Sequence, residues 1–157
     1  MLSGQVTIGD LCKVTGYTRH QVHGLVKMAL SDRPTKGERF AREFRSQDLI
    51  VVAAIAELET KFGISRGRVA VVAKRLSQVL AGPRVPNPAA RLIVTFDPPK
   101  VIYAELPGPV LDGVVMPLGP VFDRVDNYVT TASATSEQQQ LRLGPAVLRA
   151  ATKRESS

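Results

Sequence analysis

The residues with the most chemical potential lie close together near the amino terminus of the sequence. Arg19, His20, His23 and Lys27 all occur within residues 19–27. The two histidines are three residues apart and could hold a metal from one helix face. No Cys, Asp or Glu lies beside them to complete such a site, so we expect histidines that face solvent or DNA and no bound metal. Donor-rich side chains on the first two turns of a helix are typical of a helix that contacts base edges in the major groove of duplex DNA.

Patterns expected of an enzyme are missing from the sequence. Hydrolytic or acid–base catalysis normally needs a nucleophile with a base, a pair of carboxylates, or metal ligands at a recognisable spacing. No glycine-rich phosphate loop is present either. Cys12 is the only cysteine, and its place on an apolar helix stripe favours a buried small side chain. We therefore expect a protein that is not an enzyme and that takes no cofactor.

Two short helices joined by a tight turn would position the basic residues. Thr7 can cap the first helix together with Asp10, and Gly16 can end it at positive φ without a Cβ penalty. Thr18 can cap the second helix, with Gln21 in the capping-box position. This pattern favours a helix-turn-helix, although any amphipathic helical hairpin also has a polar face. The residues expected on the DNA-reading side are Thr18, Arg19, His20, His23 and Lys27.

The charge of the chain is unevenly distributed. The 157 residues carry a formal net charge of +7. Residues 1–84 contain 14 Lys and Arg against 7 Asp and Glu, whereas residues 85–157 contain 7 of each. The whole excess therefore lies in the half that contains the helix-turn-helix pattern, which favours an anionic partner such as nucleic acid.

A polar and basic segment follows Leu30. Pro34 and Gly37 argue against a helix there and favour a hairpin or a loop. A hairpin at this place would be the wing of a winged helix-turn-helix, lying along the sugar-phosphate backbone; the alternative is a solvated charged loop. Phosphate contacts of this kind supply affinity more than sequence choice. The candidates are Arg33, Lys36, Arg39, Arg42 and Arg45.

Two more helices are expected before residue 82. Ser46 can cap a third helix that runs to about Phe62, and Ser65 can open a fourth that runs to Leu80. Basic side chains in the first turn of the fourth helix oppose the helix dipole, a cost that a bound phosphate would offset. We therefore predict a phosphate clamp made of Ser65, Arg66 and Arg68.

Residues 6–80 resemble the DNA-binding domain of the MerR-type transcriptional regulators. The resemblance depends on the opening TIGDLCKVTG of residues 7–16, the Thr18 cap, the wing ending in Arg42-x-Phe44, and the Gly63-Ile64-Ser65 before the fourth helix. It implies a winged helix-turn-helix that binds duplex DNA as a dimer. Two features depart from the family pattern: His23-Gly24 stands where members usually carry Arg-Tyr, and the fourth helix stops at Gly82-Pro83 instead of leading to a long dimerisation helix.

The second half of the chain is harder to interpret. Residues 82–90 contain three prolines and suit an extended linker. Residues 91–96 and 101–106 suggest a hairpin, with a looser turn than two residues because Pro98 and Pro99 lie between them. Residues 110–116 and 121–129 are interrupted by Gly and Pro, and irregular strands or extended arms are expected there. The apolar runs 92–96, 101–103 and 114–116 look exposed and are candidates for a dimer interface.

The expected fold is a mainly α winged helix-turn-helix, with four helices and a wing hairpin, over residues 1–81. A Pro-rich linker over 82–90 and a small, irregular, β-containing region over 91–157 follow. This last region is expected to serve dimerisation or another interaction and to end in a mobile C-terminal tail. The expected function is sequence-specific regulation of transcription. An excisionase-like architectural protein that acts with a recombinase is an alternative, and a protein-interaction module is a third.

The expected partners are double-stranded DNA and a second copy of the chain, because one helix-turn-helix makes too few base contacts to select one genomic site. The start of the chain lacks a signal-peptide pattern, and no apolar stretch is long enough to span a membrane. We therefore expect a cytoplasmic protein, associated with a bacterial or phage nucleoid.

Overall fold

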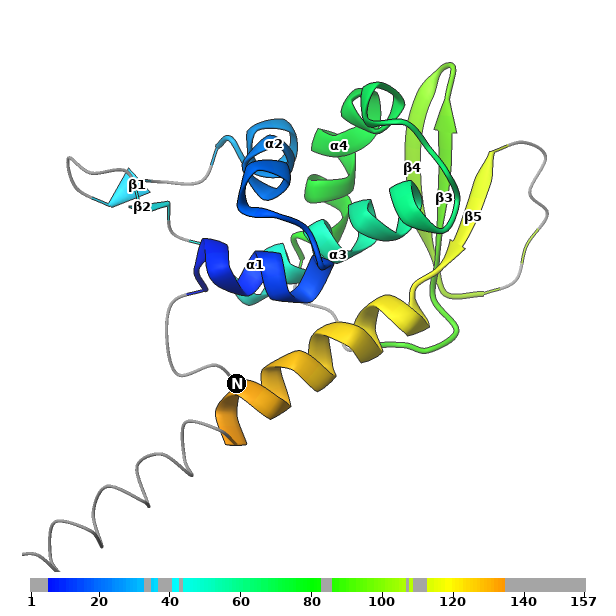
Figure 1. Ribbon diagram of the computed structural model, residues 1–157. Helices are drawn as coiled ribbons and strands as arrows, with labels where there is room; N and C mark the ends of the chain where they lie inside the picture. Colours follow the sequence, from blue (N-terminus) through cyan, green and yellow to red (C-terminus); the bar gives the residue numbers. More distant parts are fainter. Residues whose placement is uncertain are drawn as a thin grey trace, which may run out of the picture.

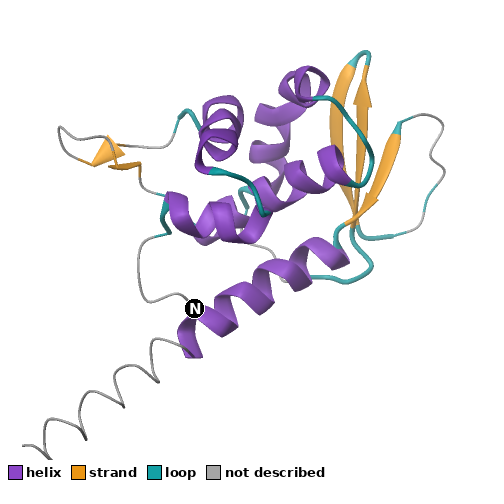
Figure 2. Ribbon diagram, viewed as in Figure 1, coloured by secondary structure: helices purple, strands orange, loops and turns teal. Residues whose placement is uncertain are grey.

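The computed structural model describes residues 6–32, 35–36, 41–42, 44–82, 86–106, 108 and 113–134. Within them the protein is mostly helical, with a small three-stranded antiparallel sheet in its C-terminal part (Figures 1 and 2). The helices are α1 (Ile8–Thr15), α2 (Arg19–Ala29), α3 (Ser46–Thr60), α4 (Arg66–Leu80) and an unlabelled helix that covers residues 119–134. No helix of the described part is long and apolar enough to cross a membrane.

Both predicted capping boxes are present at the first two helices. The Thr7 hydroxyl accepts from the backbone N–H of Asp10 at 3.3 Å, and the Asp10 carboxylate accepts from the N–H of Thr7 at 2.7 Å. Thr18 and Gln21 exchange the same two hydrogen bonds at the start of α2. Gly16 ends α1 with φ of 74°, a conformation that glycine adopts without a Cβ penalty. These local predictions are confirmed.

Helix α3 is buried on nearly every side between Asp48 and Leu58. It packs against α1, α2 and α4, so no wide polar stripe remains along it. Its start differs from the prediction, because Arg45 occupies the N-cap position and Ser46 is already helical. The Asp48 carboxylate reaches back to accept the backbone N–H of Arg45 at 2.8 Å, which replaces the expected serine cap.

The segment after α2 contains a short antiparallel hairpin. Strands β1 (Thr35–Lys36) and β2 (Ala41–Arg42) pair, with Thr35 opposite Arg42 and Lys36 opposite Ala41. The hairpin projects beyond α1 and α2 in Figure 1. The buried Phe44, two residues after the end of β2, forms an isolated antiparallel bridge with Val6.

The C-terminal sheet has the strand order β4-β3-β5. Strand β3 (Arg91–Phe96) pairs antiparallel with β4 (Pro99–Ala104) and with β5 (Val114–Pro117). The predicted hairpin is present, but its turn was predicted wrongly: Phe96 pairs with Pro99, so the turn has only two residues. Pro99 is tolerated because it opens an edge strand, where its missing N–H costs little hydrogen bonding.

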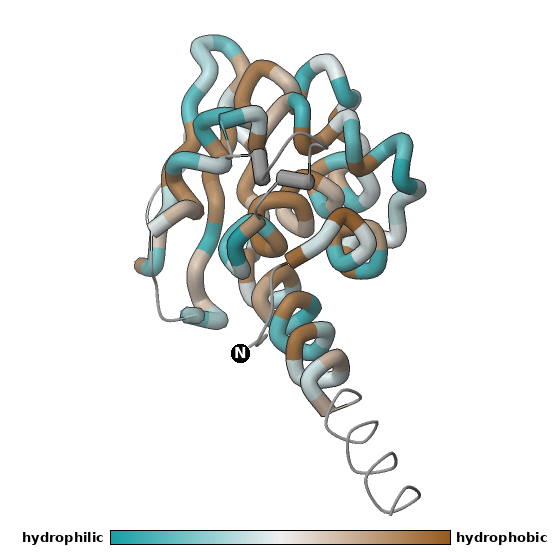
Figure 3. The backbone as a smooth tube through the Cα atoms, turned by 90° about the vertical axis from the view of Figure 1, so that its left-hand side faces the viewer, coloured by the Kyte–Doolittle hydropathy of each residue, from teal (hydrophilic) through white to brown (hydrophobic). Residues whose placement is uncertain are grey.

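Residues 119–134 are helical, which corrects the expected irregular strands or arms over 121–129. Pro120 lies in the first helical turn, where a proline removes no intrahelical hydrogen bond. Hydrophobic and hydrophilic residues alternate along the turns of this helix in Figure 3. Its inward side continues a helical spacing that begins just before it, and the residues buried there are Leu118, Val121, Phe122 and Val125.

The two halves of the chain share one hydrophobic core. Leu92, Val94 and Met116 of the sheet are completely buried and belong to the same cluster as the residues of α1 to α4. Part of the apolar surface that looked exposed in the sequence is therefore core within a single chain, and Phe96, Val101, Tyr103 and Val114 are half-buried against that core. Ile102, at 39% exposure, and Leu106, at 79%, remain accessible. Residues 83–85 of the predicted linker lie outside the described part, and dimerisation stays a prediction.

The helix of residues 119–134, here called the C-terminal helix, is joined to the N-terminal half by polar contacts that include those of Arg124 and Tyr128. Figure 1 shows this helix in yellow and orange, running below α1 and α3. Arg124 donates to the carboxylate of Glu57 at 3.0 Å, and Lys61 pairs with the same carboxylate at 2.6 Å. The Tyr128 hydroxyl donates to Asp10 on α1. Burial tends to raise the pKa of Asp10, but the hydrogen bonds from Tyr128 and Thr7 outweigh it and hold that pKa below its ordinary value of 3.8.

Replacing Arg124 by Ala should destabilise the protein. Glu57 is only 3% exposed, and Lys61 would be its one remaining charged partner among the described residues. We expect the free energy of unfolding, measured by urea denaturation, to fall by roughly 1 to 3 kcal/mol. Asp123→Ala, at an exposed position of the same helix, is the control and should change it by less than about 0.5 kcal/mol. Equal stability of Arg124→Ala and the natural protein would contradict this role.

Tyr128→Phe should cost stability in a pH-dependent way. Because the folded pKa of Asp10 is lowered, its contribution is fully present above the unfolded pKa and is lost as the pH falls through the folded value. We expect Tyr128→Phe to lower the free energy of unfolding by about 1 kcal/mol near neutral pH. The difference between the two proteins should shrink below about pH 4. Urea denaturation across this range measures it, and a difference that does not change with pH would rule out the charged form of Asp10 as the acceptor.

Candidate nucleic-acid interface

Helix α2 turns its basic side outward. Its buried residues, Val22, Leu25, Val26 and Ala29, all lie on the side that faces the core. The opposite side of α2 and its N-cap hold the five residues predicted to read DNA, and all of them are exposed: Thr18, Arg19, His20, His23 and Lys27. The helix contains no acidic residue, so this face presents hydrogen-bond donors and positive charge without a competing carboxylate of its own.

The predicted wing residues are only partly described. Lys36 lies in β1 and Arg42 in β2, and their backbones belong to the paired hairpin. Arg45 is exposed at the N-cap of α3. Arg33 and Arg39 lie outside the described residues. Phosphate contact by these five residues stays a prediction.

A cluster of polar side chains lies behind the first half of α2. Arg66, in the first turn of α4, donates to both oxygens of Glu59 at 2.7 and 3.1 Å. The Tyr17 hydroxyl, from the turn between α1 and α2, donates to the same carboxylate at 3.1 Å. Cζ of Arg66 lies 6.0 Å from the centre of the Tyr17 ring, within the range of a cation–π contact. The cluster therefore links the turn, the end of α3 and the start of α4.

Electrostatics within the cluster favour this arrangement. Burial and the adjacent carboxylate of Glu59 raise the pKa of Tyr17 to about 12, so its hydroxyl remains a donor at neutral pH. The hydrogen bonds to Glu59 raise the pKa of Arg66 above its ordinary value. A bidentate pair between a guanidinium and a carboxylate fixes geometry as well as charge.

Gly24 gives the Arg66 guanidinium its space. A Cβ atom built at Gly24 would lie 2.8 Å from Nη1 of Arg66, closer than an ordinary contact. Glycine in a helix interior costs about 1 kcal/mol relative to alanine, so its presence in the middle of α2 calls for a packing reason. The close approach of α4 to α2 supplies one, at the position where the sequence departs from the MerR pattern.

The structure does not bring Ser65, Arg66 and Arg68 together as one clamp. Ser65 caps α4 by accepting from the backbone N–H of Arg68 at 3.4 Å. Residues two apart in a helix point to nearly opposite sides, and accordingly Arg66 contacts Glu59 whereas Arg68 lies over the ring of Phe96, 4.8 Å from its centre. Phosphate contact by any of the three stays a prediction.

Tyr17 and Glu59 were not recognised as site residues from the sequence. Glu59 and Arg66 are separated by the break between α3 and α4, and no helical or strand spacing pairs residues across such a break. The one available signal was Gly24, because a glycine inside a helical pattern indicates a close approach.

The histidines of α2 gain no metal partner in the described structure. No group of three His, Cys, Asp or Glu that could hold a metal ion occurs among the described residues.

The chain matches no protein-family model, no curated protein and no solved structure. The functional interpretation therefore depends on the geometry and chemistry of the site.

Gly24→Ala should reveal the contact with Arg66. Alanine normally stabilises a helix interior by about 1 kcal/mol over glycine, but here the new Cβ would push Arg66 away from Glu59. We expect a smaller gain, or a loss, in the natural background and the full gain of about 1 kcal/mol in an Arg66→Ala background. Urea denaturation of the four proteins of this double-mutant cycle measures the coupling. The same effect in both backgrounds would show that Arg66 does not restrict position 24.

Proposed function

We propose that this protein is a sequence-specific DNA-binding transcriptional regulator of the MerR-like type. The exposed face of α2 would enter the major groove, with Arg19 and the adjacent side chains contacting base edges. The proposal depends on this exposed face: Thr18 at the N-cap and four donor-bearing residues on α2 are exposed, and the helix holds no carboxylate. Arginine is the residue that most often reads guanine, through two hydrogen bonds to its O6 and N7 atoms.

The distribution of charge supports the same partner. The positive excess of residues 1–84 surrounds this face in the sequence. The β1–β2 hairpin, with Lys36 and Arg42, would act as the wing and contact phosphates. Such contacts supply affinity that depends on salt and is largely independent of sequence. Base choice would then belong to α2 and affinity to the hairpin.

The cluster behind α2 supports a rigid reading element. Tyr17, Glu59 and Arg66 join three elements through hydrogen bonds of 2.7 to 3.1 Å. A binding residue performs best when its supporting element is held by packed and hydrogen-bonded neighbours. Two copies of the chain would be needed to select one genomic site, with half-sites about one helical turn apart.

Selection of binding sites from a random duplex library by gel shift tests the proposal. We expect an enriched two-part site with inverted symmetry, as a dimeric regulator requires. Footprinting that instead protects clustered direct repeats at an attachment site would favour an excisionase-like architectural protein. Failure to enrich any duplex would overturn the proposal.

Arg19→Ala should weaken specific binding and relax base preference at one position of the selected site. A bidentate arginine to guanine contributes roughly 1 to 3 kcal/mol of discrimination. Lys74→Ala, at an exposed position of α4, removes the same unit of charge outside the reading helix and is the matched control. Repeating the binding-site selection with each variant measures the change in base preference. If Arg19→Ala selects the same DNA sequence as the natural protein, α2 is not the helix that reads the bases.

A further inference from the structure

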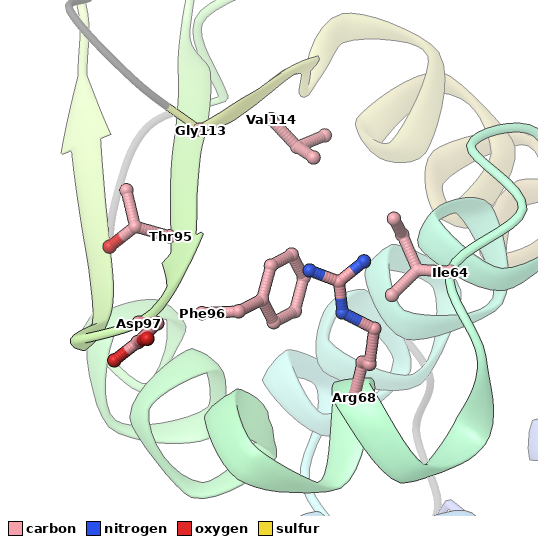
Figure 4. A pocket seen from close by; sticks show the side chains of 7 residues that line it. All are labelled: Ile64, Arg68, Thr95, Phe96, Asp97, Gly113 and Val114. Atoms are coloured by element: carbon pink, nitrogen blue, oxygen red, sulfur yellow. The ribbon is translucent and has the colours of Figure 1, made fainter.

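A small cavity separates the first turn of α4 from the C-terminal sheet (Figure 4). Its volume is about 290 Å³, close to the lower end of the range of ligand pockets. Ile64, Phe96 and Val114 supply apolar walls, and Arg68 supplies a positive charge. The cavity lies on the side of α4 that faces the sheet, whereas Arg66 faces Glu59, so it is separate from the cluster behind α2.

Arg68, an exposed residue, makes an aromatic contact beside the cavity. Its guanidinium stacks on the Phe96 ring at 4.8 Å, and no ion pair of Arg68 occurs among the described residues. Arg66, two residues earlier, is neutralised by Glu59 at 2.7 Å. A stacked guanidinium keeps its planar fork of donors available, and that fork matches the two oxygens of a carboxylate.

Two further polar residues, Thr95 and Asp97, line the cavity. The Thr95 hydroxyl donates to the carbonyl oxygen of Pro98 at 2.9 Å, so the charge of Asp97 is what limits the class of ligand. Asp97 lies beyond the Phe96 ring from Arg68, at the other end of the cavity (Figure 4). A second negative charge at that end would be repelled. The space near Arg68 is bordered by Ile64 and Val114, and it suits an uncharged apolar body. The chemistry therefore favours a compact molecule with a single carboxylate.

Gly113 shapes the sheet side of the cavity. Its φ is 113°, and a Cβ there would lie 2.7 Å from the carbonyl oxygen of Val94. Only glycine allows the chain to enter β5 this close to β3. The wall that carries Val114 is thus set by the backbone.

We propose that this cavity binds a small organic monocarboxylate, whose carboxylate pairs with Arg68 and whose apolar body lies between Ile64, Phe96 and Val114. The proposal does not depend on DNA binding, because none of these four residues belongs to the exposed face of α2. Its test likewise requires no DNA.

Isothermal titration calorimetry on the full chain tests the site with benzoate as the probe. We expect saturable binding of one benzoate per chain. Benzamide, which has a similar shape without the charge, should bind roughly tenfold more weakly, because hydrogen bonds to a charged group are stronger than those to a neutral one. Inorganic phosphate should also bind more weakly than benzoate, since it cannot use the apolar walls.

Two variants test separately the charge of Arg68 and the empty volume of the cavity. Arg68→Gln should reduce benzoate binding to the level of benzamide, whereas Arg75→Gln, at an exposed position on the same helix that does not line the cavity, should leave it unchanged. Val114→Phe should abolish benzoate binding by filling the cavity while Arg68 remains. Thermal melts verify that each variant folds. If Arg68→Gln does not fold, the comparison of benzoate with benzamide and the Val114→Phe result decide.

Four outcomes would overturn the proposal. Benzoate could show no saturable binding, or it could bind Arg68→Gln as well as the natural protein. Phosphate as tight a ligand as benzoate would indicate a plain anion site without an apolar part. Undiminished binding by Val114→Phe would place the ligand elsewhere.

Discussion

The burial of α3 on nearly all sides is the constraint on which the other elements depend. A helix without a solvent-facing stripe must have neighbours all round, and α1, α2, α4 and the C-terminal helix provide them. Its charged groups must then be compensated inside the protein. Glu57 receives Arg124 and Lys61, and Asp48 accepts the backbone N–H of Arg45. The C-terminal half therefore helps to bury α3 and to compensate the charge of Glu57.

This constraint also explains why α2 can present a fully polar face. Its apolar side is used on α3 and α4, and Gly24 lets α4 approach closely enough for Arg66 to reach Glu59. The exposed side then has no packing duty and can carry residues chosen for contact with a partner. A helix that reads DNA needs a packed side that holds it in place and an exposed side that is free of packing contacts. On this physical ground we propose DNA as the partner.

The first turn of α4 shows how two identical residue types acquire different roles. Arg66 is paired with a carboxylate and holds three elements together, while Arg68 is stacked on an aromatic ring and keeps its donors available. Both were expected to contact phosphate, since a basic first turn opposes the helix dipole. The structure offers a different compensation for Arg66, namely the carboxylate of Glu59. It leaves Arg68 beside a cavity.

What the sequence determined by itself was local. The two capping boxes, the turn at Gly16, the presence of the hairpins and the exposed face of α2 depend on residues within a few positions of each other. The fold keeps these local features, although it replaces the equally local Ser46 cap by Arg45. Irregular strands or arms were expected over 121–129 because glycine and proline interrupt this part of the sequence, but residues 119–134 are helical, and a proline is compatible with the first turn of a helix. Only the tertiary structure decided which distant groups meet. Three groups of contacts show this. Asp10 of α1 meets Tyr128, and Glu57 of α3 meets Arg124, both from the C-terminal helix. Arg66 of α4 meets Glu59 of α3 and lies against Gly24 of α2. No sequence period relates such residues, because their contact follows from how whole elements pack around α3.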